Sequence, residues 1–263
     1  MFHTPGEDLS LPKAHSDDFE GRFREVLSDP SNKHIPRVPD AGTLQNGHLV
    51  MHNGLLVTPD YYGDFFKILT LNDGVHEPQE ERMFMEVLKH LRPGATMVEL
   101  GAYWAFYSMW FQKEISDGES FLIEPAQDRL DVGRRNFELN GFDGKFFQGE
   151  IGPEGIDFKQ FLIDQDIHHL DLLHADIQGF ELFLLESITS LLEANKISYL
   201  FLSTHTQQLH ISCLQLLKNH NYKILASADF DHETYCYDGV IVARNQLVAG
   251  LEPIQLDVRS SPG

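Results

Sequence analysis

The sequence contains little cysteine and no long apolar run. Its 263 residues include two cysteines, Cys213 and Cys236, and neither lies in a C-x-x-C pair. This pattern does not indicate a disulfide framework, and free thiols in a reducing compartment are expected. No apolar run approaches the length of a membrane-spanning helix, and residues 1–18 lack the apolar core of a secretory signal. We therefore expect a cytoplasmic protein without a membrane partner.

Positive charge is also scarce. Forty acidic residues face 20 basic ones, which gives a formal net charge of −20, and lysine and arginine form no cluster. Such a surface repels phosphate backbones and anionic headgroups. Nucleic acid is therefore not expected as a partner, and a small-molecule or glycan substrate is favoured.

The chain divides into three segments by composition. Residues 1–45 form a polar, proline-punctuated arm, with a helix expected around residues 17–27. Residues 46–95 hold a hairpin and a helix that lead into the domain of residues 96–263. Apolar runs flank Asn53-Gly54, which predicts a hairpin with a type I′ turn over residues 48–58. A second helix is expected to begin at Pro78 and to end at Pro93-Gly94, with Phe84, Val87, Leu88 and Leu91 on one face.

After residue 96, strand and helix patterns alternate, which is typical of a parallel sheet with helices on both faces. The pattern predicts seven strands, at 97–101, 120–124, 145–148, 170–176, 197–205, 222–228 and 239–243. Helices are expected at 104–113, 126–139, 158–165, 179–194 and 206–220. Only ten residues join the last two strands, too few for a parallel crossover, so the last strand is expected to run antiparallel to its neighbour.

The loop after the first strand indicates which cofactor the sheet binds. A dinucleotide site needs G-x-G-x-x-G so that the backbone can approach a pyrophosphate. This loop has Gly101 alone, followed by Tyr103 and Trp104, and it therefore disfavours a dehydrogenase. S-adenosylmethionine has no phosphates and needs a turn plus a carboxylate for its ribose. Gly101 supplies the turn, and Glu124 ends the second strand close to the spacing expected for a ribose ligand.

Five motifs in order resemble those of FkbM-type methyltransferases. The first-strand segment VELGAYWAFYS resembles V-D-I-G-A-N-x-G-x-Y-S, and FLIEPAQDRLDVGRRNFELNG resembles E-P-x-P-x-x-x-x-x-L-x-x-N-x-x-L-N-G. LLHADIQGFE resembles L-K-I-D-V-E-G-x-E, LSTH resembles V-E-I-H, and GVHEPQE resembles the segment before the family's first strand. The resemblance implies an α/β fold of the class I methyltransferase type, a Rossmann-like seven-stranded sheet that binds S-adenosylmethionine. It also implies acceptor hydroxyls on polyketides and sugars.

The chain departs from these motifs at five positions. The family's Asn and second Gly in the first loop are replaced, as are the Lys and Glu of its fourth-strand motif and the Glu of its fifth strand. The residues found there are Tyr103, Ala105, His174, Gln178 and Ser203. Cofactor binding is compatible with these changes, because Gly101 and Glu124 remain.

Further cofactor contacts are expected beside these two residues. Glu99 precedes the turn, Tyr103 lies within the loop, and Glu150 with Ile151 follows the third strand where adenine is expected. Glu77, just before the Pro78 helix, is expected at the cofactor's amino group or at the acceptor. Tyr61 and Tyr62, after the hairpin, are candidates either for lining an acceptor pocket or for simple packing.

Catalysis at a hydroxyl requires a base, and two residues at strand ends are the candidates. His205 ends the fifth strand and Asp176 ends the fourth, so we expect His205 to be the general base and Asp176 to orient it or touch the cofactor. His174 is interpreted as a packing residue. A divalent metal on Asp176, Glu181 and His205 is the less favoured alternative.

Together these features predict an S-adenosylmethionine-dependent O-methyltransferase. The substrate is expected to be a hydroxyl of a small molecule, natural product or sugar. The alternatives are a non-catalytic S-adenosylmethionine-binding module and a metal-assisted O-methyltransferase.

Overall fold

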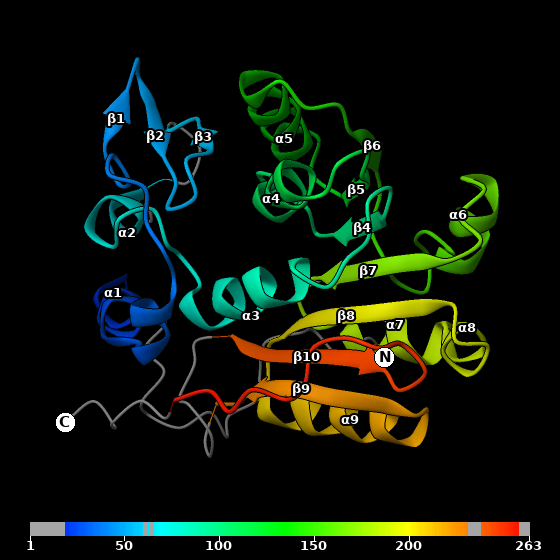
Figure 1. The fold of residues 1–263 in the computed structure, drawn as a ribbon. Helices are drawn as coiled ribbons and strands as arrows, with labels where there is room; N and C mark the ends of the chain where they lie inside the picture. The colour runs from blue at the N-terminus through cyan, green and yellow to red at the C-terminus, as the bar shows by residue number, and fades with distance from the viewer. Residues whose placement is uncertain (1–18, 60–62, 64–65, 231–237, 258–263) are drawn as a thin grey trace.

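A seven-stranded sheet forms the centre of the molecule (Figure 1). The computed structural model describes residues 19–59, 63, 66–230 and 238–257. The strand order is β6-β5-β4-β7-β8-β10-β9, and the first five of these strands are mutually parallel. The strands are β4 (Thr96–Leu100), β5 (Glu119–Glu124), β6 (Lys145–Gln148), β7 (Leu170–Ala175), β8 (Ile197–Thr204), β9 (Tyr222–Ala228) and β10 (Gly239–Asn245).

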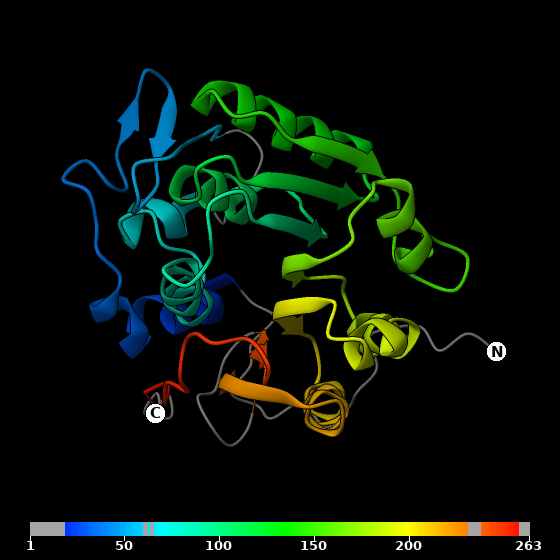
Figure 2. The same ribbon diagram turned by 45° about the vertical axis from the view of Figure 1, so that its right-hand side comes forward.

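Helices cover both faces of this sheet, as the alternation of apolar residues predicts (Figures 1 and 2). One face packs against α3 (Pro78–Leu88), α4, α5 and the N-terminal hairpin, and the other packs against α6, α7, α8 and α9. The helices of the domain are α4 (Phe106–Glu114), α5 (Gln127–Asn140), α6 (Phe158–Asp164), α7 (Glu181–Ser187), α8 (Thr189–Glu193) and α9 (Gln207–Asn219). Successive residues of a strand enter different cores: Met97 lies in the first and Val98 in the second.

The last strand is reversed, and this confirms the predicted fold class. β10 pairs antiparallel with both β8 and β9. It lies between them, which leaves β9 at the edge of the sheet. The short connection requires the reversal, but only packing decides that β10 inserts inside β9.

The N-terminal part of the chain forms a small sheet and three short helical segments beside α3. β2 (His48–Val50) pairs antiparallel with β3 (Leu56–Val57), which confirms the hairpin, and β1 (Leu44–Gln45) adds a third strand. The predicted turn type is wrong, because Gly54 has a positive φ and Asn53 does not. The helical segments are α1 (Phe19–Ser28), η1 (Pro30–His34) and α2 (Phe66–Leu71).

Two predicted helices differ from those in the structure. α3 begins at Pro78 as expected but ends at Leu88 rather than at Pro93. The helix expected over 179–194 is interrupted at Ile188, where α7 ends and α8 begins. The Thr189 hydroxyl donates to the carbonyls of Leu185 and Glu186, and such side-chain bonds compete with the helical ladder.

Two further expectations concern cysteine and membranes. Cys213 is a buried free thiol, whereas Cys236 lies outside the described residues. None of the helices within the described ranges combines the length and the apolarity that crossing a bilayer requires.

Candidate functional site

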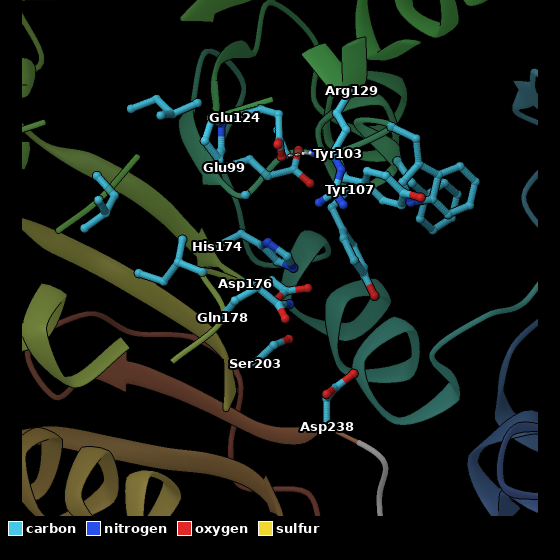
Figure 3. Close-up of a pocket in the computed structure, with 18 of the residues that line it drawn as sticks. Glu99, Tyr103, Tyr107, Glu124, Arg129, His174, Asp176, Gln178, Ser203 and Asp238 are labelled. Atoms are coloured by element: carbon cyan, nitrogen blue, oxygen red, sulfur yellow. Dashed lines mark hydrogen bonds between the residues drawn. The ribbon is translucent and has the colours of Figure 1, made fainter. Parts of the chain in front are cut away.

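A cavity of about 490 Å³ opens where the central strands end (Figure 3). β4 lies between β5 and β7, so the strand order reverses there, and the cavity takes residues from the carboxyl ends of all three. Open α/β sheets bind their ligands at such a point. Every residue predicted to bind the cofactor lines this cavity, namely Glu77, Glu99, Gly101, Tyr103, Glu124, Glu150, Ile151 and Asp176.

The turn at Gly101 brings two strand ends into close contact. Gly101 has φ +75°, and a Cβ atom there would lie 1.8 Å from the carbonyl oxygen of Asp176. Tyr103 and Ala105 also adopt left-handed backbone conformations, with φ of 45° and 67°. These are the positions at which the resembled motif has Asn and Gly, which adopt that conformation most readily. The loop therefore keeps a left-handed path although both residues are replaced.

The two large aromatic side chains of this loop leave the cavity open. Trp104 is 7% exposed and stacks on Phe106, with ring centroids 5.5 Å apart. Arg129 lies over the Tyr103 ring, 4.9 Å from its centroid. Both aromatic residues line the cavity wall without closing it.

Glu124 lies at the end of β5 and holds the loop in place. One carboxylate oxygen accepts a hydrogen bond from the Tyr103 amide at 3.1 Å, and the other accepts one from the Ala126 amide at 3.0 Å. Burial raises the pKa of Glu124, and these two bonds oppose that shift. Each oxygen retains a second lone pair, so the carboxylate can also accept hydrogen bonds from the hydroxyl groups of a ligand.

Glu99 and Glu77 both accept hydrogen bonds from residues of α4. Glu99 accepts hydrogen bonds from the amide and hydroxyl of Ser108, and burial raises its pKa to about 7. Glu77 accepts a hydrogen bond from the Tyr107 hydroxyl at 2.8 Å and lies 3.1 Å from Nε2 of His76. Glu77 therefore contributes to the cavity wall as a carboxylate that is already partnered.

Beyond the ends of β6 and β7, the rim of the cavity includes exposed side chains. Ile151 is buried, whereas Glu150 and Gln178 are exposed. Gln178 donates to Oδ1 of Asp176 at 2.9 Å. Phe180 is 36% exposed and forms an apolar part of the rim. Such a rim suits an adenine ring, which presents polar edges and apolar faces.

His205 contacts Asp176 but does not line the cavity, and both its ring nitrogens face carboxylates. Nδ1 lies 3.1 Å from Glu181 Oε1, and Nε2 lies 3.2 Å from Asp176 Oδ1. Burial disfavours its charged form, but Asp176 and Glu181 outweigh burial and raise the pKa of His205 to about 11. Because a carboxylate faces each ring nitrogen, neither nitrogen is free to accept a proton from a ligand, so this arrangement suits a positioning role.

The same three side chains are close enough to bind a divalent cation. One ligand atom from each of Asp176, Glu181 and His205 lies within 4.8 Å of the others. The ion pairs of His205 already neutralise part of this acidic cluster.

A buried network on the first turn of α3 has no counterpart among the residues predicted from the sequence. Glu81 contacts His76 Nδ1 at 2.6 Å and His52 Nε2 at 3.1 Å, and all three residues are at most 3% exposed. Glu80 contacts His174, which the sequence analysis interpreted as packing. Glutamates in a first turn usually face solvent and complement the helix dipole, so the sequence gives no sign that these two are buried.

Two further residues that line the cavity, Arg22 and Asp238, lie in segments whose sequence does not indicate a functional role. Arg22 of α1 lies 3.3 Å from Asp238 Oδ2 and 3.7 Å from Glu77 Oε1. Burial raises the pKa of Asp238 to about 6, although Arg22 opposes that shift. The N-terminal helix therefore contributes to the cavity. The predicted acceptor residues Tyr61 and Tyr62 lie outside the described residues.

Comparison with known proteins shows similarity only to solved structures. No protein-family model matches the chain and no curated protein matches it, so the FkbM-type resemblance has no support from a family model. The chain is similar to a ribosomal protein L11 methylase from Lactobacillus delbrueckii subsp. bulgaricus, at 15% identity and TM-score 0.47, covering 66% of this chain and 86% of that one.

Two other similar structures contain S-adenosylhomocysteine. TrmK from M. capricolum is 17% identical with a TM-score of 0.44, covering 66% of this chain and 71% of that one. An O-methyltransferase from Bacillus cereus is 13% identical with a TM-score of 0.46, covering 65% and 82%. The similarity is one of fold. It assigns neither a substrate nor a reaction to this chain.

Proposed function

We propose that this chain is an S-adenosylmethionine-dependent methyltransferase that methylates a hydroxyl of a small molecule, natural product or sugar. The main observation in favour is the cavity at the ends of β4, β5 and β7, because its wall is rich in carboxylates. Among the described residues, six carboxylates line it: Glu77, Glu99, Glu124, Glu150, Asp176 and Asp238. The arginines that line it are Arg22 and Arg129.

The charge of this wall favours one class of cofactor over another. S-adenosylmethionine carries a sulfonium and an ammonium against one carboxylate, so it is a net cation. A dinucleotide would place a pyrophosphate among the carboxylates, which Coulomb repulsion in a partly buried site disfavours. Arg22 already pairs with Glu77 and Asp238, and Arg129 covers Tyr103.

Glu124 is the residue proposed to bind the ribose. It ends β5 beside the Gly101 turn, and its oxygens have free lone pairs after bonding the Tyr103 and Ala126 amides. Glu99 and Asp176 extend the acidic wall toward β7, where the cofactor's amino group would find carboxylates. The cofactor supplies an electrophilic methyl group, and the chain's own residues align it with an acceptor oxygen.

Calorimetric titration with S-adenosylmethionine and S-adenosylhomocysteine tests the proposal. We expect both to bind and NADH not to bind. Glu124→Ala should weaken binding by about 10- to 100-fold through lost hydrogen bonds to the ribose. Glu154→Ala is the matched control, because Glu154 is exposed and does not line the cavity.

Turnover is measured as S-adenosylhomocysteine formed with a panel of phenols, sugars and aliphatic alcohols. Product formation supports the methyltransferase. Tight cofactor binding without turnover on any hydroxyl would instead favour a non-catalytic binding module. Absence of binding in the wild type would refute the whole proposal.

A further inference from the structure

His174 lines the cavity, and one of its buried ring nitrogens has no hydrogen-bond partner among the described residues. It lies on β7, is 3% exposed, and lines the cavity beside Asp176 and Tyr107 (Figure 3). Its Nε2 lies 2.5 Å from Glu80 Oε1, and its buried Nδ1 has no hydrogen-bond partner among the described residues. A buried polar atom without a partner is costly, and a ligand group in the neighbouring cavity would remove that cost by bonding to it.

Glu80 fixes the orientation of this imidazole. Its second oxygen, Oε2, accepts a hydrogen bond from the Ser203 hydroxyl at 2.8 Å, and the carboxylate is 2% exposed. Three elements therefore hold the group: α3 supplies Glu80, β7 supplies His174 and β8 supplies Ser203. His174 and Ser203 are also two of the positions at which the chain departs from the resembled motifs, and both bond to Glu80.

The hydrogen bond to Glu80 selects one tautomer. A carboxylate that accepts from Nε2–H leaves the lone pair of a neutral imidazole on Nδ1. His205 differs, because carboxylates face both of its nitrogens. His174 is therefore the better placed of the two to accept a proton within the cavity.

We infer that His174 is the catalytic base for the acceptor hydroxyl and that Glu80 is its positioning residue, an inference that rests on the proposed methyltransferase function. The hydroxyl oxygen forms a bond to the methyl carbon while the carbon–sulfur bond breaks and leaves its electron pair on sulfur. The hydroxyl proton moves to Nδ1 of His174. The products are a methyl ether, S-adenosylhomocysteine and an imidazolium paired with Glu80.

Charged groups from three elements act on this imidazole. Glu80 faces it from α3, Glu99 is its register partner on β4, and Asp176 lies two residues further along its own chain. From α4, the Tyr107 ring lies 4.4 Å away between centroids. Burial disfavours the charged imidazole, but Glu80, Glu99 and Asp176 outweigh burial and raise the pKa of His174 to about 9. Turnover is therefore expected to rise with pH up to about 9.

Nitrogen NMR of histidine-labelled protein tests the inference without an acceptor. Titration of the wild type should show that His174 becomes neutral near pH 9 and then has its proton on Nε2. Glu80→Gln should lower the pKa of His174 by more than one unit, and Glu80→Asp should restore part of the shift. S-adenosylhomocysteine should move the His174 signal and leave that of His210 unchanged. A neutral tautomer with the proton on Nδ1, or a pKa that Glu80→Gln does not change, overturns the inference.

Turnover of any acceptor that the wild type methylates gives the second test. His174→Gln keeps a donor toward Glu80 but removes the base, and kcat should fall by about 10²- to 10⁴-fold with little change in KM. S-adenosylhomocysteine should bind this variant within about threefold of wild type.

His210→Gln is the matched control. His210 is equally buried, bonds Thr204 and Ser227, and does not line the cavity, so turnover should persist. Wild-type turnover in His174→Gln overturns the inference while leaving the proposed function intact. Failure of the wild type to bind S-adenosylhomocysteine would refute the proposed function instead.

Discussion

Replacing Gly101 with alanine tests whether close packing of the first loop on β7 shapes the cavity. The added Cβ would lie 1.8 Å from the Asp176 carbonyl oxygen and 2.9 Å from its carbonyl carbon, well inside normal contact distance. The left-handed backbone at φ +75° costs about 1–2 kcal/mol for a non-glycine residue, and the clash adds about 1–3 kcal/mol. The expected loss of unfolding free energy is therefore about 2–5 kcal/mol.

Gly141→Ala separates the two contributions. Gly141 ends α5 with φ +72°, but a Cβ there meets nothing within 4 Å, so this variant has the backbone cost alone, about 1–2 kcal/mol. The gain from a stiffer unfolded chain applies to both variants and cancels. The difference between them therefore measures the contact with Asp176.

Urea unfolding followed by tryptophan fluorescence provides the measurement, because Trp104 and Trp110 are both buried. S-adenosylhomocysteine binding to Gly101→Ala should also fall by at least about tenfold, because the loop must move away from β7. Equal stability of the two variants, with unchanged binding in Gly101→Ala, would show that this contact neither strains the fold nor shapes the site.

Three further outcomes are expected. Ala105→Gly should raise the unfolding free energy by about 0.5–1 kcal/mol in the same urea assay, because Ala105 has φ +67° and glycine adopts this conformation without strain. A lower unfolding free energy would show that the contacts of the Ala105 methyl group outweigh the backbone strain. Burial disfavours ionised Glu81, but His76 and His52 outweigh burial and hold its pKa well below the usual value, so this group stabilises the fold above about pH 4 and the contribution is lost as the pH falls. Glu81→Gln should consequently flatten the dependence of unfolding free energy on pH between about 5 and 3, and an unchanged slope would contradict the assignment. Exhaustive chelation should leave turnover unchanged, since Asp176 and Glu181 already pair with His205; recovery of lost activity by one divalent metal would favour the metal-assisted mechanism.

Local patterns in the sequence determined most of the sheet. Strands such as Lys145–Gln148 and Tyr222–Ala228 are found with the predicted bounds, because apolar runs between turn residues specify strands locally. The ten-residue connection before β10 fixed its reversed direction, since a parallel crossover needs more chain. Gly101 and Glu124 could be placed in one cavity because residues that end neighbouring parallel strands meet at the same edge.

Tertiary structure alone decided which polar groups meet across elements. Glu80 and Glu81 have the sequence pattern of an exposed first turn, yet α3 packs against the sheet and buries both beside histidines. His174 follows the apolar pattern of a buried strand, and only the approach of α3 gives it a carboxylate partner. Arg22 lines the cavity, although its helix, α1, is separated from β4 in the sequence by all the strands of the N-terminal sheet. Such contacts depend on how elements distant in the chain pack together. Local sequence periodicity carries no information about this packing.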